Sequence, residues 1–180
     1  MSKLVPLTIA TSLGLTLLAA CSSYDPNDRI DPTVGTVVSD AGIGEDFKPV
    51  ARMLVGRCGS IDCHGSKYRN FRLYGYGSER LFSDDTPNSK LPDGQTFVRA
   101  EEAVEDYNSM VALEPTIYLQ VIREGGQAPD RLTLMRKARN HENHKGNKPI
   151  IEGDQADVCL QSWLQGHVAT QACIDGSGLK

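Results

Sequence analysis

Large aromatic side chains are scarce in this sequence: Phe, Trp and Tyr make up 6% of its 180 residues, and Trp163 is the only tryptophan. Glycine and proline are frequent by comparison, with 17 and 9 residues. This composition predicts a thin apolar core and long loops, because few side chains can fill a large interior. We therefore expect a bound group to help complete the core.

An excess of basic residues is also absent. The 19 Lys and Arg residues are outnumbered by 23 Asp and Glu residues, the formal net charge is −4, and no basic run occurs. Such a chain would repel a phosphate backbone, so the usual modes of nucleic-acid binding are excluded. The length corresponds to one domain of modest size.

The sequence has no apolar run long enough to cross a bilayer core, which is about 30 Å thick. The longest run, Leu4–Leu18, follows Lys3 and leads into Leu18-Ala19-Ala20-Cys21. A basic residue, an apolar stretch and a small-residue cleavage site in this order are typical of a secretory signal peptide. A short anchor helix is the alternative.

The run Leu18–Cys21 resembles the bacterial lipobox, in which the cysteine is lipidated and becomes the first residue of the mature protein. The resemblance implies that residues 1–20 are a lipoprotein signal peptide and that Cys21 anchors the protein to a membrane of the bacterial cell envelope. Ser22 stands where an Asp would favour retention on the inner membrane. The outer membrane is therefore favoured.

Residues 22–44 are rich in Asp, Pro, Gly, Ser and Thr. This composition buries too little apolar surface to offset the entropy lost on ordering. We predict that residues 21–44, with lipidated Cys21, form a flexible tether that spans about 25 Å. The folded domain then occupies residues 45–168, and residues 169–180 form a C-terminal tail.

Apolar residues recur at helical spacing in five places, which predicts an all-α fold with long loops. The expected helices run from Phe47 to about Arg57, over 99–113, from Pro115 to Gly125, over 132–139 and from Asp154 to Gly166. On the second of these helices, Glu101, Glu102 and Glu105 are expected to face solvent. On the last helix we expect Asp154 as the cap and an apolar face made by Val158, Leu160, Trp163 and Leu164.

The residues with the clearest chemistry lie directly after the first expected helix, in a C-x4-C-H run made by Cys58, Cys63 and His64. Two thiols followed by an imidazole can add to the vinyl groups of a haem and ligate its iron from one face. The common spacing is C-x-x-C-H. The two extra residues must loop outward, and Gly59 would help because it accepts unusual backbone angles.

This run and several later segments resemble a small bacterial c-type cytochrome domain. The segments that carry the resemblance are 47–50, 63–65, 132–138, 144–146, 153–154 and 159–164. The resemblance covers about residues 45–168. It implies a small cytochrome c-like all-α domain, in which the N- and C-terminal helices pack together around one covalent haem c. It also implies that His64 is the proximal iron ligand, with Cys58 and Cys63 forming the thioethers.

Other chemistries of these residues stay open. Cys58 and Cys63 can form a short disulfide beside an uninvolved His64, as secreted proteins allow. Zinc could be bound by Cys58, Cys63, His141 and His144, although only two residues separate the histidines, where three to five are usual. No independent feature selects a cysteine-protease dyad. Haem attachment is the interpretation that we favour.

The second axial ligand of the iron is expected to be His144, because this histidine stands before Lys145-Gly146 in a polar loop and has no packing role there. Met135 is the runner-up, although its neighbours Leu132 and Leu134 suggest a core residue. Met110 and His141 are more distant candidates, and His167 is expected at the surface. A vacant or water-occupied position would suit catalysis or gas binding instead.

Two further groups complete the candidate site residues. Cys159 and Cys173 are expected to form a disulfide, which closes a loop of about 15 residues and contributes roughly 3 kcal/mol. Phe71 and Leu73 are expected to line the haem edge, with Arg69 or Arg72 pairing with a propionate. A solvated basic patch is the alternative for the two arginines.

Taken together, these features predict a membrane-anchored monohaem lipoprotein that carries electrons outside the cytoplasm, with a redox protein as its partner. We expect an electron carrier rather than an enzyme, with no nucleic-acid partner. The alternatives are a haem-free, disulfide-stapled binding or structural lipoprotein and a zinc-stabilised module. Bis-histidine ligation predicts a lower reduction potential than His/Met ligation.

Overall fold

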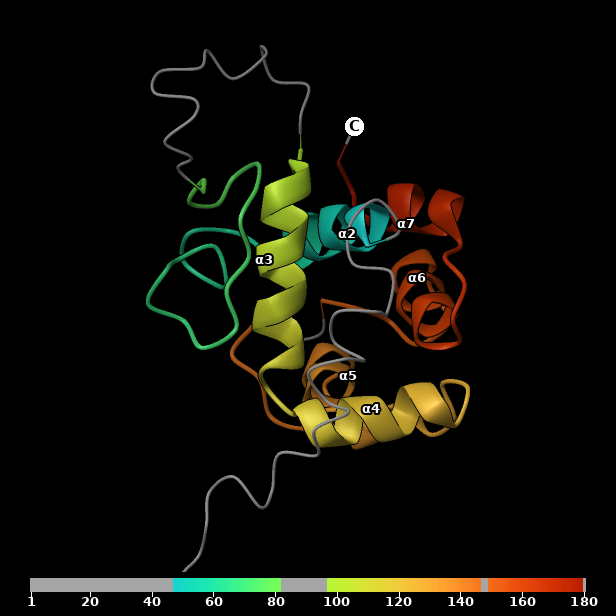
Figure 1. Cartoon of the computed structure of the whole chain (residues 1–180). Coiled ribbons are helices and arrows are strands. Elements are labelled where there is room, and N and C mark those ends of the chain that lie inside the picture. The colour runs from blue at the N-terminus through green and yellow to red at the C-terminus, as the bar shows by residue number, and fades with distance from the viewer. Residues whose placement is uncertain (1–46, 82–96, 147–148, 180) are drawn as a thin grey trace, which may run out of the picture. The chain divides into compact units, whose positions relative to one another are not determined.

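The computed structural model describes residues 47–81, 97–146 and 149–179, all within one compact unit (Figure 1). In these ranges it contains six α-helices, one short 3-10 helix and no strand, which confirms the all-α prediction. The elements are α2 (Lys48–Cys58), α3 (Ala100–Val111), α4 (Pro115–Arg123), η2 (Pro129–Arg131), α5 (Thr133–Ala138), α6 (Gln155–Leu164) and α7 (Thr170–Gly176).

The predictions for the signal peptide, for lipidated Cys21 and for the tether concern positions outside the described residues. Within the described ranges, none of the helices combines the length and the apolar character that crossing a membrane requires.

Local sequence signals account for several helix ends. Pro49 lies in the first turn of α2 and Pro115 begins α4, where a missing N–H costs little. The carboxylate of Asp154 accepts a hydrogen bond from the Asp157 backbone N–H at 2.8 Å, so Asp154 caps α6 as predicted. Gly166, with φ of 86°, then takes the left-handed conformation that ends this helix.

The core is centred on four aromatic rings from four different parts of the chain. Phe47 lies 5.3 Å from Tyr107 and 5.1 Å from Trp163, and Tyr118 stacks on Trp163 at 5.5 Å between ring centroids. Because α2 contacts α3 and α6, these rings meet where the three helices come together. Four of the eleven aromatic residues of the sequence thus form one buried cluster.

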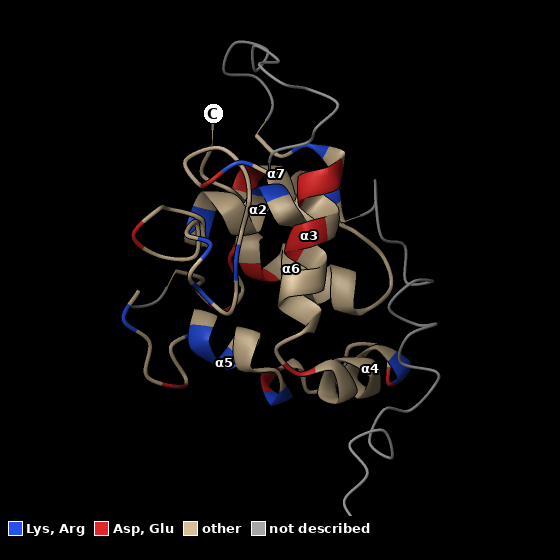
Figure 2. Cartoon of the chain, turned by 60° about the vertical axis from the view of Figure 1, so that its left-hand side comes forward, with Lys and Arg blue, Asp and Glu red and all other residues tan. Residues whose placement is uncertain are grey.

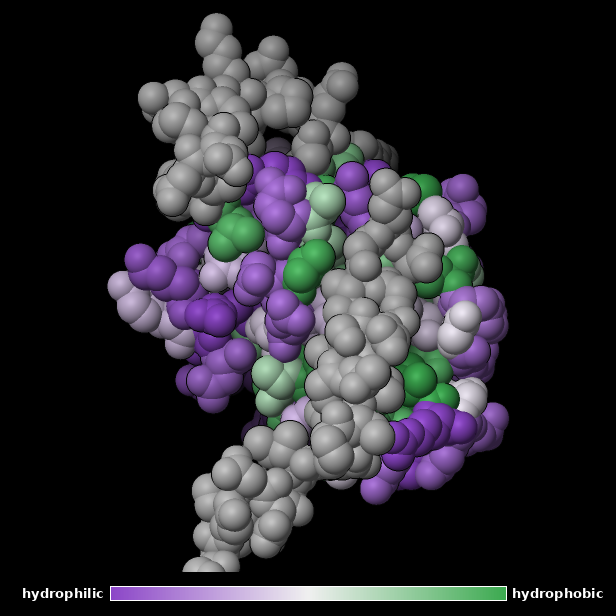
Figure 3. All heavy atoms as spheres, in the orientation of Figure 1, coloured by the Kyte–Doolittle hydropathy of each residue, from purple (hydrophilic) through white to green (hydrophobic). Residues whose placement is uncertain are grey.

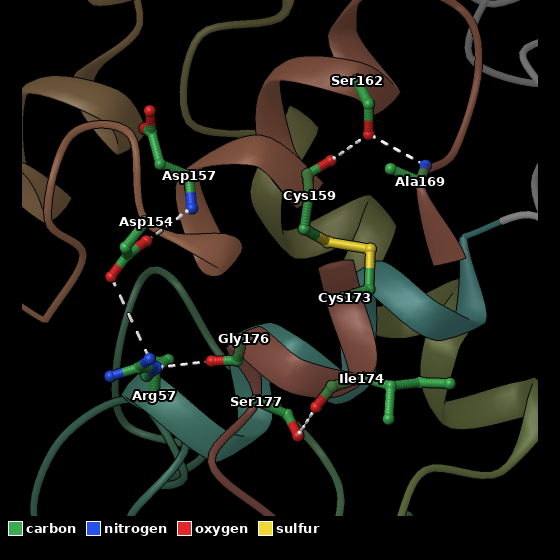
Figure 4. Close-up of a disulfide and its surroundings, with 10 residues drawn as sticks. All are labelled: Arg57, Asp154, Asp157, Cys159, Ser162, Ala169, Cys173, Ile174, Gly176 and Ser177. Carbon is green, nitrogen blue, oxygen red and sulfur yellow. Dashed lines mark hydrogen bonds and ion pairs between the residues drawn. A yellow bond between two sulfur atoms is a disulfide. The ribbon is translucent and has the colours of Figure 1, made fainter. Parts of the chain in front are cut away.

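The C-terminal segment, which was predicted as a tail, contains helix α7 over residues 170–176. This helix packs on both α6 and α2, and Figure 4 shows the expected Cys159–Cys173 disulfide joining it to α6. The Arg57 guanidinium donates a hydrogen bond to the Gly176 carbonyl at 2.5 Å, so α7 also touches the C-terminal end of α2 (Figure 4). A Cβ on Gly56 would overlap the Ser177 carbonyl, and glycine is therefore required there.

Two expectations about helix faces are wrong. Glu102 is fully buried rather than solvent-facing, and it forms ion pairs with Arg80 at 2.7 Å and Arg99 at 3.0 Å. Val158 is 38% exposed rather than part of the buried face of α6, while Leu160, Trp163 and Leu164 are buried as predicted. The partners of Glu102 offset the cost of burying its charge.

Candidate functional site

The C-x4-C-H run forms a compact turn after α2. The His64 backbone N–H donates to the Cys58 carbonyl at 3.0 Å, while Cys63 and Gly65 both donate to the Ser60 carbonyl at 2.9 Å. Cys58 and His64 are thereby held together, and residues 60–63 between them turn out toward solvent. Gly59 has an ordinary φ of −85°. Its role is to allow close approach to the Val55 carbonyl and the Ser78 hydroxyl, which a Cβ would prevent.

The orientation of His64 is set by one hydrogen bond. Its Nδ1 lies 2.9 Å from the Phe71 carbonyl oxygen, which can only accept, so Nδ1 carries the proton and Nε2 is the nitrogen suited to a metal. Burial lowers the pKa of His64 most strongly, the neighbouring His144 and Arg69 lower it further, and the Phe71 carbonyl opposes them. A neutral imidazole is the form that ligates metals.

His144 lies opposite His64, although the two come from distant parts of the chain. Their ring centroids are 5.9 Å apart and their planes differ by only 7°. The Nδ1 atom of His144 is buried without a hydrogen-bond partner in the structure. Two metal–nitrogen bonds of about 2 Å, added to two ring radii of about 1 Å, span about 6 Å, so one metal ion would fit this centroid separation once an in-plane nitrogen of each ring points at it.

Both imidazoles border a cavity of about 410 Å³. Its apolar wall is made by Phe71, Leu113, Leu134, Ala138 and Pro149. The lining residues include the cationic side chains of Arg69 and Lys137 but no Asp or Glu, although the chain as a whole is acidic. Figure 2 shows Lys and Arg residues on α5 and Asp and Glu residues on α3. The cavity therefore suits an apolar group that carries negative charge at its edge.

The two cysteines of the run differ in their surroundings. Cys58 lines the cavity, and burial, with a smaller contribution from Cys63, raises the pKa of its thiol to about 12. Cys63 is exposed and is not among the lining residues. Both are free thiols in the structure rather than a disulfide pair. Attachment of one group through both sulfurs requires the Cys63 side chain to turn inward.

The competing iron ligands lie elsewhere. Met135 is fully buried in the core, and neither it nor Met110 lines the cavity. His141 lies beside two carboxylates, 3.5 Å from Asp130 and 3.9 Å from Glu152. Within the described ranges no three or more Cys, His, Asp or Glu residues form a metal-binding group, so the four zinc candidates are not gathered. His167 is exposed, as expected.

Of the four residues that were expected around the haem in the segment after the C-x4-C-H run, two line the cavity and two do not. Phe71 and Arg69 line the cavity, and the Arg69 guanidinium also donates to the backbone carbonyls of Cys63 at 3.0 Å and Asp62 at 3.1 Å. Leu73 is buried in the core, and Arg72 is exposed; neither lines the cavity. Figure 3 shows mainly hydrophilic residues over this loop, on the left of the view.

Sequence reasoning missed the contribution of α5 to the cavity. Thr133, Leu134, Lys137 and Ala138 line it, and their i, i+4 spacing marks one face of this helix. Lys137 is held there by an ion pair with Glu142 at 2.5 Å and by a hydrogen bond to the Asn143 carbonyl at 3.0 Å. The spacing was visible in the sequence, but the cavity that this face borders was not.

Comparisons of the chain with protein-family models, with curated proteins and with solved structures find no match. The chemistry of the site must therefore be judged from its own residues. A haem has an apolar ring, carboxylate side chains at one edge and an iron that binds imidazole on both faces. The apolar wall, the two cations and the two imidazoles are compatible with such a group, and Cys58 also lines the cavity.

Proposed function

We propose that this protein carries one covalently attached haem c and transfers single electrons outside the cytoplasm, held at a membrane by lipid on Cys21. The observation that carries the proposal is the pair of parallel imidazoles, 5.9 Å apart, at the edge of a cavity that Cys58 also lines. A redox protein is the proposed partner, and the protein is proposed to be a carrier rather than an enzyme.

Each residue has a proposed role in holding the group. Cys58 and Cys63 would form the thioethers, and His64 and His144 would hold the iron. The Phe71 carbonyl keeps the Nε2 atom of His64 available for the metal. When bound, the haem supplies an iron that alternates between the ferrous and ferric states.

The remaining lining residues control the surroundings of the group. Phe71, Leu113 and Leu134 exclude water from one side of the cavity. Arg69 and Lys137 supply positive charge for the propionates. Imidazole on both faces gives a lower potential than imidazole with a thioether.

The full chain, coexpressed with haem-maturation machinery, tests the attachment. A pyridine haemochrome spectrum is expected to show haem held by thioether bonds, and replacing Cys58 and Cys63 together by alanine is expected to abolish it. A colourless wild-type protein would overturn the proposal. It would leave the haem-free binding lipoprotein as the explanation of the cavity.

The axial ligands are tested with a matched pair of variants. His144→Ala is expected to convert the low-spin, six-coordinate spectrum of the iron into a high-spin spectrum. Met135→Leu conserves core volume and lies outside the cavity lining, so its spectrum is expected to remain that of the wild type. The reverse pattern would assign the ligand to Met135.

A further inference from the structure

A polar stripe lies along the buried side of α3. Glu102, Asp106 and Ser109 are spaced at i, i+4 and i+7, which places them on one face of the helix. Two of them are fully buried, and Ser109 is 8% exposed. Polar side chains in such positions need hydrogen-bond partners, and here most of the partners belong to the segment that follows the C-x4-C-H run.

The three side chains accept backbone hydrogen bonds from this segment in antiparallel order. The Arg72 N–H donates to the Ser109 hydroxyl at 2.6 Å, and the Tyr74 N–H donates to Asp106 at 2.6 Å. Farther along, the Leu81 N–H donates to Glu102 at 3.2 Å. Residues 71–81 have no strand partner in the structure, so α3 supplies the acceptors that a neighbouring strand would otherwise provide.

The Ser109 bond reaches His64 through a single peptide group. The carbonyl of Phe71, which accepts from His64 Nδ1, and the N–H of Arg72, which donates to Ser109, belong to the same planar peptide unit. Rotation of this unit would break both bonds together. The Leu73 N–H donates to the His64 carbonyl at 2.8 Å, which holds the segment against His64 from the other side.

We propose that Ser109 is a positioning residue for the iron ligand His64, because it fixes the peptide whose carbonyl orients the imidazole. Asp106, the next acceptor on α3, holds the same segment through the Tyr74 N–H. The effect on the iron rests on the proposed function, whereas the orientation of His64 does not. The hydrogen bond at Nδ1 makes the imidazole a more basic ligand and stabilises the ferric state.

The test compares Ser109→Ala with Ser162→Ala in the full, haem-loaded protein. Ser162 is a matched control, since its buried hydroxyl also accepts a loop N–H, from Ala169 at 3.0 Å, but on α6. Ser109→Ala is expected to raise the reduction potential, with up to about a tenfold change in the ferric-to-ferrous ratio, or about 59 mV for one electron. Ser162→Ala is expected to lower the denaturation midpoint without moving the potential.

A second readout does not depend on haem. Nitrogen NMR of the His64 ring in the protein without haem is expected to show the Nδ1-protonated form in the wild type and in Ser162→Ala, and a mixture of tautomers in Ser109→Ala. Ser109→Thr, which keeps the hydroxyl, is expected to restore the wild-type form. Unchanged tautomers in Ser109→Ala would overturn the positioning role. Failure to attach haem would instead overturn the proposed function and leave this result standing.

Discussion

The two ends of α2 are held in different ways. At its N-terminal end Phe47 is fully buried against aromatic rings of α3 and α6. At its C-terminal end Cys58 opens onto a cavity, and the loop beyond it is fixed by backbone hydrogen bonds and by the polar stripe of α3. Apolar packing thus stabilises one end, whereas directional polar contacts shape the other. Variants at the N-terminal end of α2 should therefore change mainly the free energy of unfolding. Variants at its C-terminal end should change mainly the chemistry of the cavity.

The largest effect is expected at the aromatic end. Trp163 contacts Phe47 and stacks on Tyr118, and it is 7% exposed, so Trp163→Ala would leave a large void. We expect the free energy of unfolding to fall by about 3–5 kcal/mol, measured by urea denaturation. Trp163→Phe keeps an aromatic ring, so its free energy of unfolding should fall by clearly less. A loss below about 1 kcal/mol for Trp163→Ala would show that this end is not the main source of stability.

A smaller effect is expected from the disulfide that ties α7 to α6. Replacing both Cys159 and Cys173 by alanine removes a cross-link between residues 14 positions apart. The free energy of unfolding is expected to fall by about 3 kcal/mol, because the unfolded chain regains loop entropy. Thermal denaturation with and without a reductant checks this result. The variant should then be insensitive to the reductant, and a wild type equally insensitive would contradict the expectation.

The smallest effect concerns the polar end and depends on pH. Burial, with contributions from Glu102 and Glu105, raises the pKa of Asp106 from 3.8 to about 8, while the Tyr74 N–H opposes the rise. The folded state therefore binds one more proton than the unfolded state between about pH 4 and pH 8, so wild-type stability falls as the pH rises through this window. Asp106→Asn has no carboxyl group at this position, so its stability does not fall for this reason.

The advantage of Asp106→Asn over the wild type is thus expected to grow by about 1 kcal/mol between pH 6 and pH 7. Urea denaturation of both proteins across this range measures it. The side-chain amide oxygen introduced by Asp106→Asn can still accept a hydrogen bond from the Tyr74 N–H, so residues 71–81 should keep their position. Parallel pH profiles would contradict the raised pKa.

The sequence predicted the features that depend on local chemistry. The cap of α6 follows from Asp154 and the position three residues later, and the disulfide follows from the spacing of Cys159 and Cys173. The roles of His144 as iron ligand and of Arg69 at a propionate stay predictions. What the structure adds is that His144 faces His64, a relation between residues far apart in the chain.

The sequence-based expectations failed where distant partners override a local pattern. Glu102 looked solvent-facing because its neighbours Glu101 and Glu105 are charged, but Arg80 and Arg99 make its burial favourable. Helix α7 has seven residues and little helical periodicity of its own. It is instead held by the disulfide and by close packing on α2, and the packing cannot be read from its own residues.

The positions of the four site residues in the chain also bear on the order of assembly. Cys58, Cys63 and His64 lie within seven consecutive residues, so this half of the site exists in the newly made chain before any tertiary structure forms. His144 joins it only when α5 and the loop after it have packed into place. A haem attached as proposed would therefore meet Cys58, Cys63 and His64 first and His144 only afterwards.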